Sequence, residues 1–313
     1  MNKFSLMLAT AGVSFLLTTS CHSVSAAEKT TVVNTNGSEY SVTIDGVPQE
    51  VITRDMTPSQ GFTSISMGGA TNITINKGKF KVVVTGAKKI VEKVNIVSDG
   101  QTLSMKKDYP VAISITMPEL KGVFASGATM INVANNVVTP DFKVDASGAA
   151  NMRFQNIQCD GVDIMMSGGA RLSANGMTVK KSNIQVAGGA AVYLKTVSAT
   201  TFNCEVAGGA LIDVNSVNAV NLVAECSGGS HVKYEKAMAD DVKIGCSGAS
   251  IFKCPNVQTR DLSAQTSGSG CITVSGISGS AVLQASGASQ VHAAGLKSSD
   301  VTAQASGAAS INR

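Results

Sequence analysis

The chain has 313 residues, which is enough for one to three domains. Hydrophobic residues make up 43% of it, but aromatic residues only 4%, with no Trp and 31 Gly. Small side chains with few large rings suit a narrow, regular β architecture better than a bulky globular core. The net charge of +4 is divided among residues of both signs along the chain, which excludes the strongly basic surface expected of a nucleic-acid-binding protein.

Residues 1–26 are typical of a secretory signal segment. Lys3 supplies the positive start, and an apolar stretch follows from Phe4 to Leu17. This stretch is too short for a spanning helix and lies at the extreme N-terminus. Two processing routes stay open: cleavage after Ala26, or lipidation of Cys21, since the residues before Cys21 resemble a relaxed bacterial lipobox. Both routes predict an exported protein, either soluble or lipid-anchored.

Two segments with weaker patterns follow the signal segment. Residues 27–60 are polar, and we expect them to form an extended lead-in. Residues 61–120 predict irregular β coils at the N-terminal end of the head. Two observations support this prediction. Degenerate copies of a downstream repeat occur at Met67–Ala70 and Thr85–Ala87, and apolar and polar residues alternate in Lys81–Val84, Val94–Val97 and Val111–Thr116.

A Ser-Gly-Ala or Ala-Gly-Gly-Ala cluster recurs through residues 121–313. Its first glycine returns every 19 to 21 residues, at Gly127, Gly148, Gly168, Gly188, Gly208, Gly228, Gly248, Gly268, Gly287 and Gly307. Glycine suits a tight corner, because the φ values that such a corner needs are resisted by a Cβ atom. We therefore interpret these ten glycines as structural turn residues.

The residues around each glycine alternate between apolar and polar. Positions two, four and six before the glycine, and four, six and nine after it, are apolar or small; the columns between them are mostly polar. A period of two indicates strands with one face inward and one face outward. Nine residues after Gly268, for example, this register places Ile277 inside.

Together these patterns predict an all-β fold. We expect a right-handed parallel β-helix, or β-solenoid, of ten coils over residues 121–313, each coil of about twenty residues with Ser-Gly-Ala or Gly-Gly turns. Adjacent coils should lie about 4.8 Å apart. A β-propeller fits less well, because its blades need about forty residues each.

The chain also resembles a known family. The run Gly61–Ala70, then Thr74–Gly78 and Val94–Leu103, is similar to the opening of the auto-transporter adhesin head GIN domain family, and the serial Ser-Gly turns resemble its repeats. The resemblance covers about residues 58–313. It implies a parallel β-helix exported by Gram-negative bacteria, with an adhesive role proposed from architecture. It carries over no catalytic residue, cofactor or metal ligand.

Candidate chemical groups are few and mostly have structural interpretations. Glu205 and Glu225 occupy one outward column on adjacent coils, where they form either a carboxylate pair or part of a solvated polar face. Tyr193 is the one aromatic residue of the outward column five after the glycine. His22, His231 and His292 are isolated, so no zinc site is expected. The recurring motif serines, such as Ser167, belong to turns.

The cysteines beyond Cys21 have no C-x-x-C spacing, which disfavours a zinc ribbon or a thioredoxin-like motif. Cys226 and Cys246 share an inward column on adjacent coils, and Cys204 and Cys254 also fall in inward columns. We expect buried thiols. A Cys226–Cys246 disulfide is the alternative, permitted by an oxidising compartment but strained by side chains that point the same way.

We therefore predict a non-enzymatic exported protein that acts in cell-surface adhesion or interaction, in the periplasm or on the outer-membrane surface of a Gram-negative bacterium. Its partner would be a glycan, a protein or a second copy of the chain, with no cofactor and no nucleic acid, and with membrane contact only through a lipid anchor. Two alternatives stay open. One is a polysaccharide lyase or hydrolase, since parallel β-helices can host such enzymes; the other is a self-assembling envelope scaffold.

Overall fold

The computed structural model describes residues 13–17, 31–36, 39–44 and 47–313. Cys21, His22 and most of the predicted signal segment lie outside these residues. The chain divides into two compact units: residues 1–118 with 125–132, and residues 119–124 with 133–313. Each unit is described by itself.

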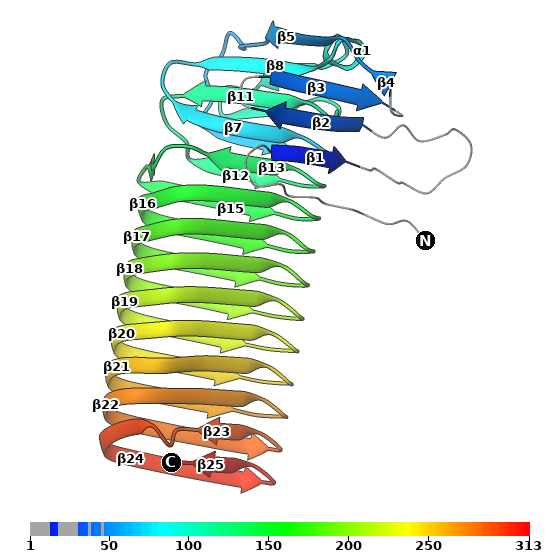
Figure 1. Ribbon diagram of the computed structural model, residues 1–313. Coiled ribbons are helices and arrows are strands. Elements are labelled where there is room, and N and C mark those ends of the chain that lie inside the picture. Colours follow the sequence, from blue (N-terminus) through cyan, green and yellow to red (C-terminus); the bar gives the residue numbers. More distant parts are fainter. Residues whose placement is uncertain (1–12, 18–30, 37–38, 45–46) are drawn as a thin grey trace. The chain divides into compact units, whose positions relative to one another are not determined.

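The second unit is a stack of parallel coils (Figure 1). In its regular part, each residue pairs with the residue twenty positions later, as Leu172 does with Val192 and Ile212 with Val232. This register confirms the predicted β-solenoid. Its strands are β14 (Val137–Val138), β15 (Asp141–Ala146), β16 (Asn151–Met166), β17 (Arg171–Val186), β18 (Ala191–Val206), β19 (Leu211–Cys226), β20 (His231–Cys246), β21 (Ile251–Thr266), β22 (Cys271–Gly287), β23 (Gln290–His292), β24 (Leu296–Gly307) and β25 (Ser310–Asn312).

The core of this stack follows the predicted columns. Ile164 and Ile184, four before their glycines, and Leu172 and Val192, four after theirs, are fully buried. Two further buried columns were not predicted. One lies two residues after each glycine from Gly148 to Gly287 and holds only Ala, Ser or Gly, since space is short at the corner; the other lies eleven after and includes Cys159 and Val179.

All ten predicted turn glycines have a positive φ, between 66° and 76°. In this region a side chain costs energy, whereas glycine is unstrained. The turns also stack on one another, because the amide after one glycine donates to the carbonyl of the glycine one coil earlier, as Gly189 N does to Gly168 O at 2.7 Å. Within a turn, Ala190 N donates to Ala187 O at 3.3 Å.

The prediction for Ile277 is wrong. Between Cys254 and Val257 the register shifts, so that Val257 pairs with Gly276 rather than with Ile277. Gly276 takes a φ of 125°, and Ile277 is 58% exposed. The coil is one residue shorter at its second corner, and a one-residue change moves a side chain to the opposite face.

The first unit is less regular. Its strands are β1 (Val13–Leu17), β2 (Thr31–Asn36), β3 (Glu39–Ile44), β4 (Val47–Pro48), β5 (Val51–Asp55), β6 (Ser64–Met67), β7 (Asn72–Lys77), β8 (Lys81–Ala87), β9 (Ile96–Ser98), β10 (Thr102–Met105) and β11 (Ala112–Met117), with one short helix, α1 (Lys88–Val91). Strands β12 (Gly122–Ala125) and β13 (Met130–Val133) cross between the two units. The polar segment expected as an extended lead-in contributes β2 to β5.

Solenoid-like and antiparallel pairings coexist in this first unit. β6 pairs parallel with β10 and β7 with β11, while β8 runs antiparallel to β5 and β11. Gly69, with φ of 73°, forms a turn on which the Gly127 turn stacks: Ala128 N donates to Gly69 O at 2.7 Å. The prediction that Thr85–Ala87 form a second degenerate copy of the turn is wrong. These residues complete β8 and lead directly into α1.

Candidate functional site

Glu205 and Glu225 lie opposite each other in the pairing of β18 with β19, and both are exposed. Each carboxylate has a lateral neighbour. Gln185 Nε2 donates to Glu205 Oε2 at 3.4 Å. Glu225 extends over Gly245 on the next coil, where an added Cβ would clash with Glu225 Oε2. Partial burial, followed by the charge of Glu205, raises the pKa of Glu225 above its ordinary value.

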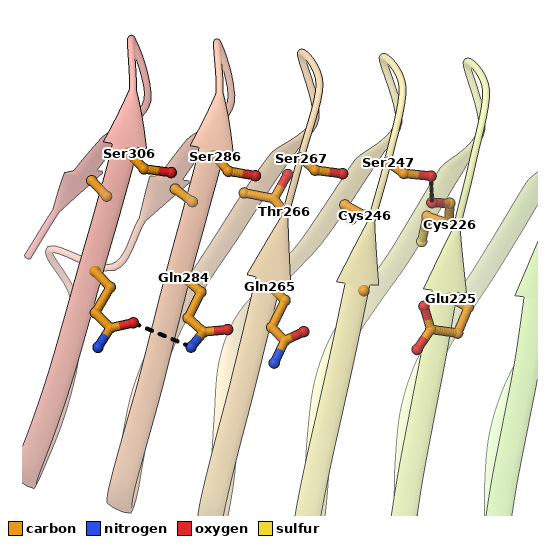
Figure 2. Close-up of a pocket in the computed structure, with 14 residues that line it drawn as sticks. Glu225, Cys226, Cys246, Ser247, Gln265, Thr266, Ser267, Gln284, Ser286 and Ser306 are labelled. Carbon is orange, nitrogen blue, oxygen red and sulfur yellow. Dashed lines mark hydrogen bonds between the residues drawn. The ribbon is translucent and has the colours of Figure 1, made fainter.

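The column of Glu225 continues as one wall of a groove along β19 to β24 (Figure 2). After the gap at Gly245, it presents three stacked amides, and the turn serines form a parallel row: Gln265, Gln284, Gln304, Ser247, Ser267, Ser286 and Ser306. The groove has a volume of about 650 Å³. Gln284 Nε2 donates to Gln304 Oε1 at 3.5 Å, so two of the three stacked amides form a hydrogen bond with each other.

A second hollow lies around Tyr193, on strands β16 to β19, and shares no residue with the groove. Its volume is about 240 Å³. The strand segments at Phe154, Ala174 and Leu194, whose side chains face the core, lie beneath the hollow, and polar residues surround the ring: Ser173, Asn175, Lys195, Asp213 and Asn215. Tyr193 itself is 40% exposed.

The hollow exists because neighbouring coils place unlike side chains in the same outward column. Tyr193 pairs with Ser173 on one side and Asp213 on the other. The small Ser173 leaves one side of the ring open. The sequence singled out Tyr193, but the contribution of Asp213 and Lys195 was missed. The available signal was that Asp213 shares the outward column of Tyr193 on the next coil, and that Lys195 follows Tyr193 by two residues on the same strand.

The cysteines belong to the core. Cys159, Cys204, Cys226, Cys246 and Cys254 are buried free thiols, and Cys271 is half-buried. Burial raises the pKa of Cys204 to about 12 and the pKa values of Cys159 and Cys254 to about 11. A nucleophilic cysteine needs a depressed pKa instead. Cys159, Cys204 and Cys254 are therefore packing groups.

Two of these thiols have defined polar partners. Cys204 Sγ lies 2.9 Å from the hydroxyl of Tyr234, which is fully buried between the rings of Phe202 and Phe252. A hydrogen bond with Cys246 and burial raise the pKa of Cys226. Each contact gives a buried polar group a partner that it would otherwise lack.

The histidines and motif serines are not brought together. His231 is exposed on the turn side of β20, and His292 makes a local contact of 3.2 Å between its Nε2 and Gln290 Oε1. Within residues 13–17, 31–36, 39–44 and 47–313, no group of three His, Cys, Asp or Glu side chains could hold a metal ion. Buried motif serines serve the turns: Ser250 Oγ donates to Ser247 O at 2.8 Å.

A small-residue core, stacked glycine turns and polar outward columns define a β-solenoid that exposes long, repetitive faces. A family model described as "Putative auto-transporter adhesin, head GIN domain" matches residues 61–236 and 222–312. The chain belongs to this family. Membership indicates an exported or cell-surface protein of the adhesin type. In the part of the chain that the structure describes, no helix is long and apolar enough to cross a membrane.

Several solved structures are similar to this chain at low sequence identity. A putative adhesin from Bacteroides fragilis is 19% identical, with 67% of this chain and 96% of that one covered, at a TM-score of 0.48. A putative adhesin from Parabacteroides merdae is 13% identical over 84% and 95%, also at 0.48. A putative lipid binding protein from Parabacteroides distasonis is 14% identical over 84% and 96%, at 0.46. The search of curated proteins found no match.

Proposed function

We propose that this protein is a non-enzymatic adhesion module of a bacterial cell envelope, which binds a glycan or a protein through the outward columns of its solenoid. The regular exposure of these columns carries the proposal: on every coil from β16 to β22, the outward position five residues after the turn glycine holds a residue with a polar group, namely Arg153, Ser173, Tyr193, Asp213, Lys233, Lys253 and Thr273. The hydrogen-bonded pairing of parallel strands alone holds equivalent side chains of neighbouring coils about 4.8 Å apart. Extended surfaces of this kind are what solenoid proteins use for binding.

The contacts of the carboxylates support a binding role over a catalytic one. A glycosidase or lyase site needs one carboxyl group free to donate a proton and a second group positioned across the scissile bond. Glu205 and Glu225 instead stack along one column, where Gln185 holds the first and Gly245 provides space for the second. Apart from Gly245, the nearest residues in that column are Gln185 and Gln265, whose amides neither donate nor accept a catalytic proton.

The location belongs to the same proposal. The predicted signal segment over residues 1–26 and the family support export to the periplasm or the outer-membrane surface of a Gram-negative bacterium. Lipidation at Cys21 would tether the chain to a membrane, whereas cleavage after Ala26 would release it. Metabolic labelling with a palmitate analogue, with a Cys21→Ala variant as control, distinguishes these two routes.

A bead-retention assay tests adhesion directly. Beads coated with the chain from residue 27 onward would be passed over mucin, over extracellular-matrix protein and over Gram-negative cells. We expect retention on at least one surface above that of beads carrying serum albumin at the same density, and loss of retention after thermal unfolding of the coat. Equal retention of coated and albumin beads on every surface would refute the adhesive role.

The enzymatic alternative has its own test. The chain would be incubated with neutral and acidic polysaccharides, followed by assays for new reducing ends and for unsaturated products. We expect neither product. Turnover that disappears in Glu205→Gln or Glu225→Gln would replace adhesion with carbohydrate cleavage as the function.

A further inference from the structure

The hollow around Tyr193 combines an exposed ring with a polar rim. The strand segments at Phe154, Ala174 and Leu194 close the bottom of the space beside the phenol; the side chains of these residues face the core and are each at most 4% exposed. The volume of about 240 Å³ is below the roughly 300–1,000 Å³ that holds drug-sized ligands. The space therefore fits one ring-sized unit, not a folded segment of another protein.

Asp213 lines this hollow, and one of its two carboxylate oxygens has no hydrogen-bond partner among the described residues. This oxygen, Oδ1, is buried. A buried acceptor without a donor costs free energy, so a native protein usually supplies one from the chain, from water or from a ligand. Asp213 lies opposite Tyr193 in the pairing of β18 with β19, so its carboxylate group borders the space beside the ring.

The charges around the hollow balance. Lys195 and Asp213 both line it, and Lys233, on the next coil, interacts electrostatically with Asp213. Lys233 is itself paired with Glu235, whose hydrogen bond is the main reason that the pKa of Lys233 is raised. Neither an anion nor a cation therefore meets an excess of opposite charge, which favours a neutral ligand.

We propose that the Tyr193 hollow binds one neutral pyranose residue of a surface glycan. The apolar C–H face of the sugar packs on the phenol ring, in the manner of other contacts between apolar groups and aromatic faces. A sugar hydroxyl donates to the carboxylate group of Asp213, and Asn175 and Asn215 border the remaining hydroxyls. This inference rests on the proposed adhesive function and names its ligand class.

The site occurs once in the regular stack. In the same outward column, the neighbouring coils carry Ser173, Asp213, Lys233 and Lys253, none of which offers a ring. A single sugar site is expected to be weak on its own, and many copies of the protein on one cell would raise the total binding strength. This arrangement matches adhesion between surfaces better than capture of a free sugar.

Saturation-transfer NMR on the full chain tests the assignment. The probes are the methyl glycosides of glucose, galactose, mannose and N-acetylglucosamine, with methyl glucuronide as an anionic probe and methyl glucosaminide as a cationic one. We expect transfer to at least one neutral glycoside, strongest on the C–H protons of one sugar face. Tyr193→Ala should weaken binding about tenfold or more, and Asp213→Ala should also weaken it.

Two variants serve as matched controls. Tyr193→Phe keeps the ring and should retain binding, while Lys253→Ala, in the same column three coils away, should leave it unchanged. Circular dichroism and melting temperature verify that each variant is folded. Absence of transfer to every neutral glycoside, stronger transfer to a charged probe, or equal affinity of Tyr193→Ala and the unchanged chain would overturn the site.

The bead assay separates this inference from the broader function. Retention that falls for Tyr193→Ala and is blocked by the neutral glycoside supports both. Retention that is the same for Tyr193→Ala and the unchanged chain overturns the sugar site and leaves adhesion standing. Saturation transfer at Tyr193 without retention on any surface would overturn adhesion and leave the sugar site standing.

Discussion

Gly208 and Gly209 are consecutive residues of one turn, yet they have different structural constraints. Gly208 has φ of 72°, and a Cβ there would lie 3.1 Å from Gly188 O on the preceding coil. At Gly209 the corresponding contact would be an ordinary 3.6 Å. Backbone geometry and stacking therefore both require glycine at position 208. At position 209 neither of them does.

Gly208→Val should lower the free energy of unfolding by about 2–4 kcal/mol, because it adds backbone strain and crowds the neighbouring turn. Gly209→Ala is the control and should be close to neutral. Chemical denaturation followed by circular dichroism measures both. An unchanged unfolding midpoint for Gly208→Val would contradict the position of the corner.

Glu225 gives a pH-dependent prediction at the same scale. Its pKa is raised in the folded protein, mainly by burial and then by Glu205, so the folded chain holds this proton more tightly than the unfolded chain. Stability from this residue is therefore present at low pH and is lost as pH rises from the ordinary carboxyl pKa through the raised one. Glu225→Gln should melt at a higher temperature than the unchanged chain at about pH 7, and the difference should shrink in acid. A lower melting temperature for Glu225→Gln at neutral pH would contradict this account.

At the scale of the strand, burial separates the cysteines into two groups. Cys204, Cys226 and Cys254 are at most 3% exposed, whereas Cys271 begins β22 and is half-buried. Because the thiolate is the reacting species, the raised pKa values of Cys204, Cys226 and Cys254 add to their inaccessibility.

Native alkylation should therefore modify Cys271 first, and the five buried cysteines only after unfolding. Peptide mass spectrometry after brief iodoacetamide treatment, with and without denaturant, measures this order. Samples would be kept free of reductant, so that a Cys226–Cys246 cross-linked peptide could be detected. Such a peptide would show that these residues are oxidised in the protein.

Alternation along a strand was the part of the fold that the sequence could predict best. Ile164 and Leu172 are inside because every second side chain of a strand faces the same way. That rule fails at corners, where the backbone changes direction, so the inward position of Cys159 was missed and Ile277 was placed on the wrong face. Glu225 was correctly placed outward, but its position over Gly245 depends on a side-chain conformation that spacing alone does not determine.

At the scale of the whole molecule, the spacing of the repeat predicts the fold better than it predicts the candidate site. A constant period predicts which coil lies next to which, so Tyr193 and Asp213 could be placed on adjacent coils. Whether they enclose a space depends on the size of their neighbours and on the burial of single atoms, such as Asp213 Oδ1. The first unit is less regular. Its sequence has no constant period from which the helix α1 or the antiparallel pairing of β8 with β5 and β11 could be predicted.

The repeat itself is testable by deletion. Removing residues 169–188, one full coil, joins Gly168 to Gly189 and restores the same columns between β16 and β18. We expect a cooperatively folded protein with a modestly lower melting temperature, because stability in such stacks is a sum over neighbouring units. Removing only residues 169–178 would set strands against corners and abolish cooperative melting. Equal melting of the two deletions would contradict the register.

The twenty-residue coil has a mechanical consequence. Within the stack a coil adds about 4.8 Å of length. Once pulled free, the same twenty residues extend to at most about 66–72 Å. Since each coil holds only its neighbours, tension on the chain would release coils one after another rather than all at once. A cell held by this protein in flowing liquid would thus be on a tether that lengthens stepwise, dissipating a sudden pull before the bond to the surface has to bear it.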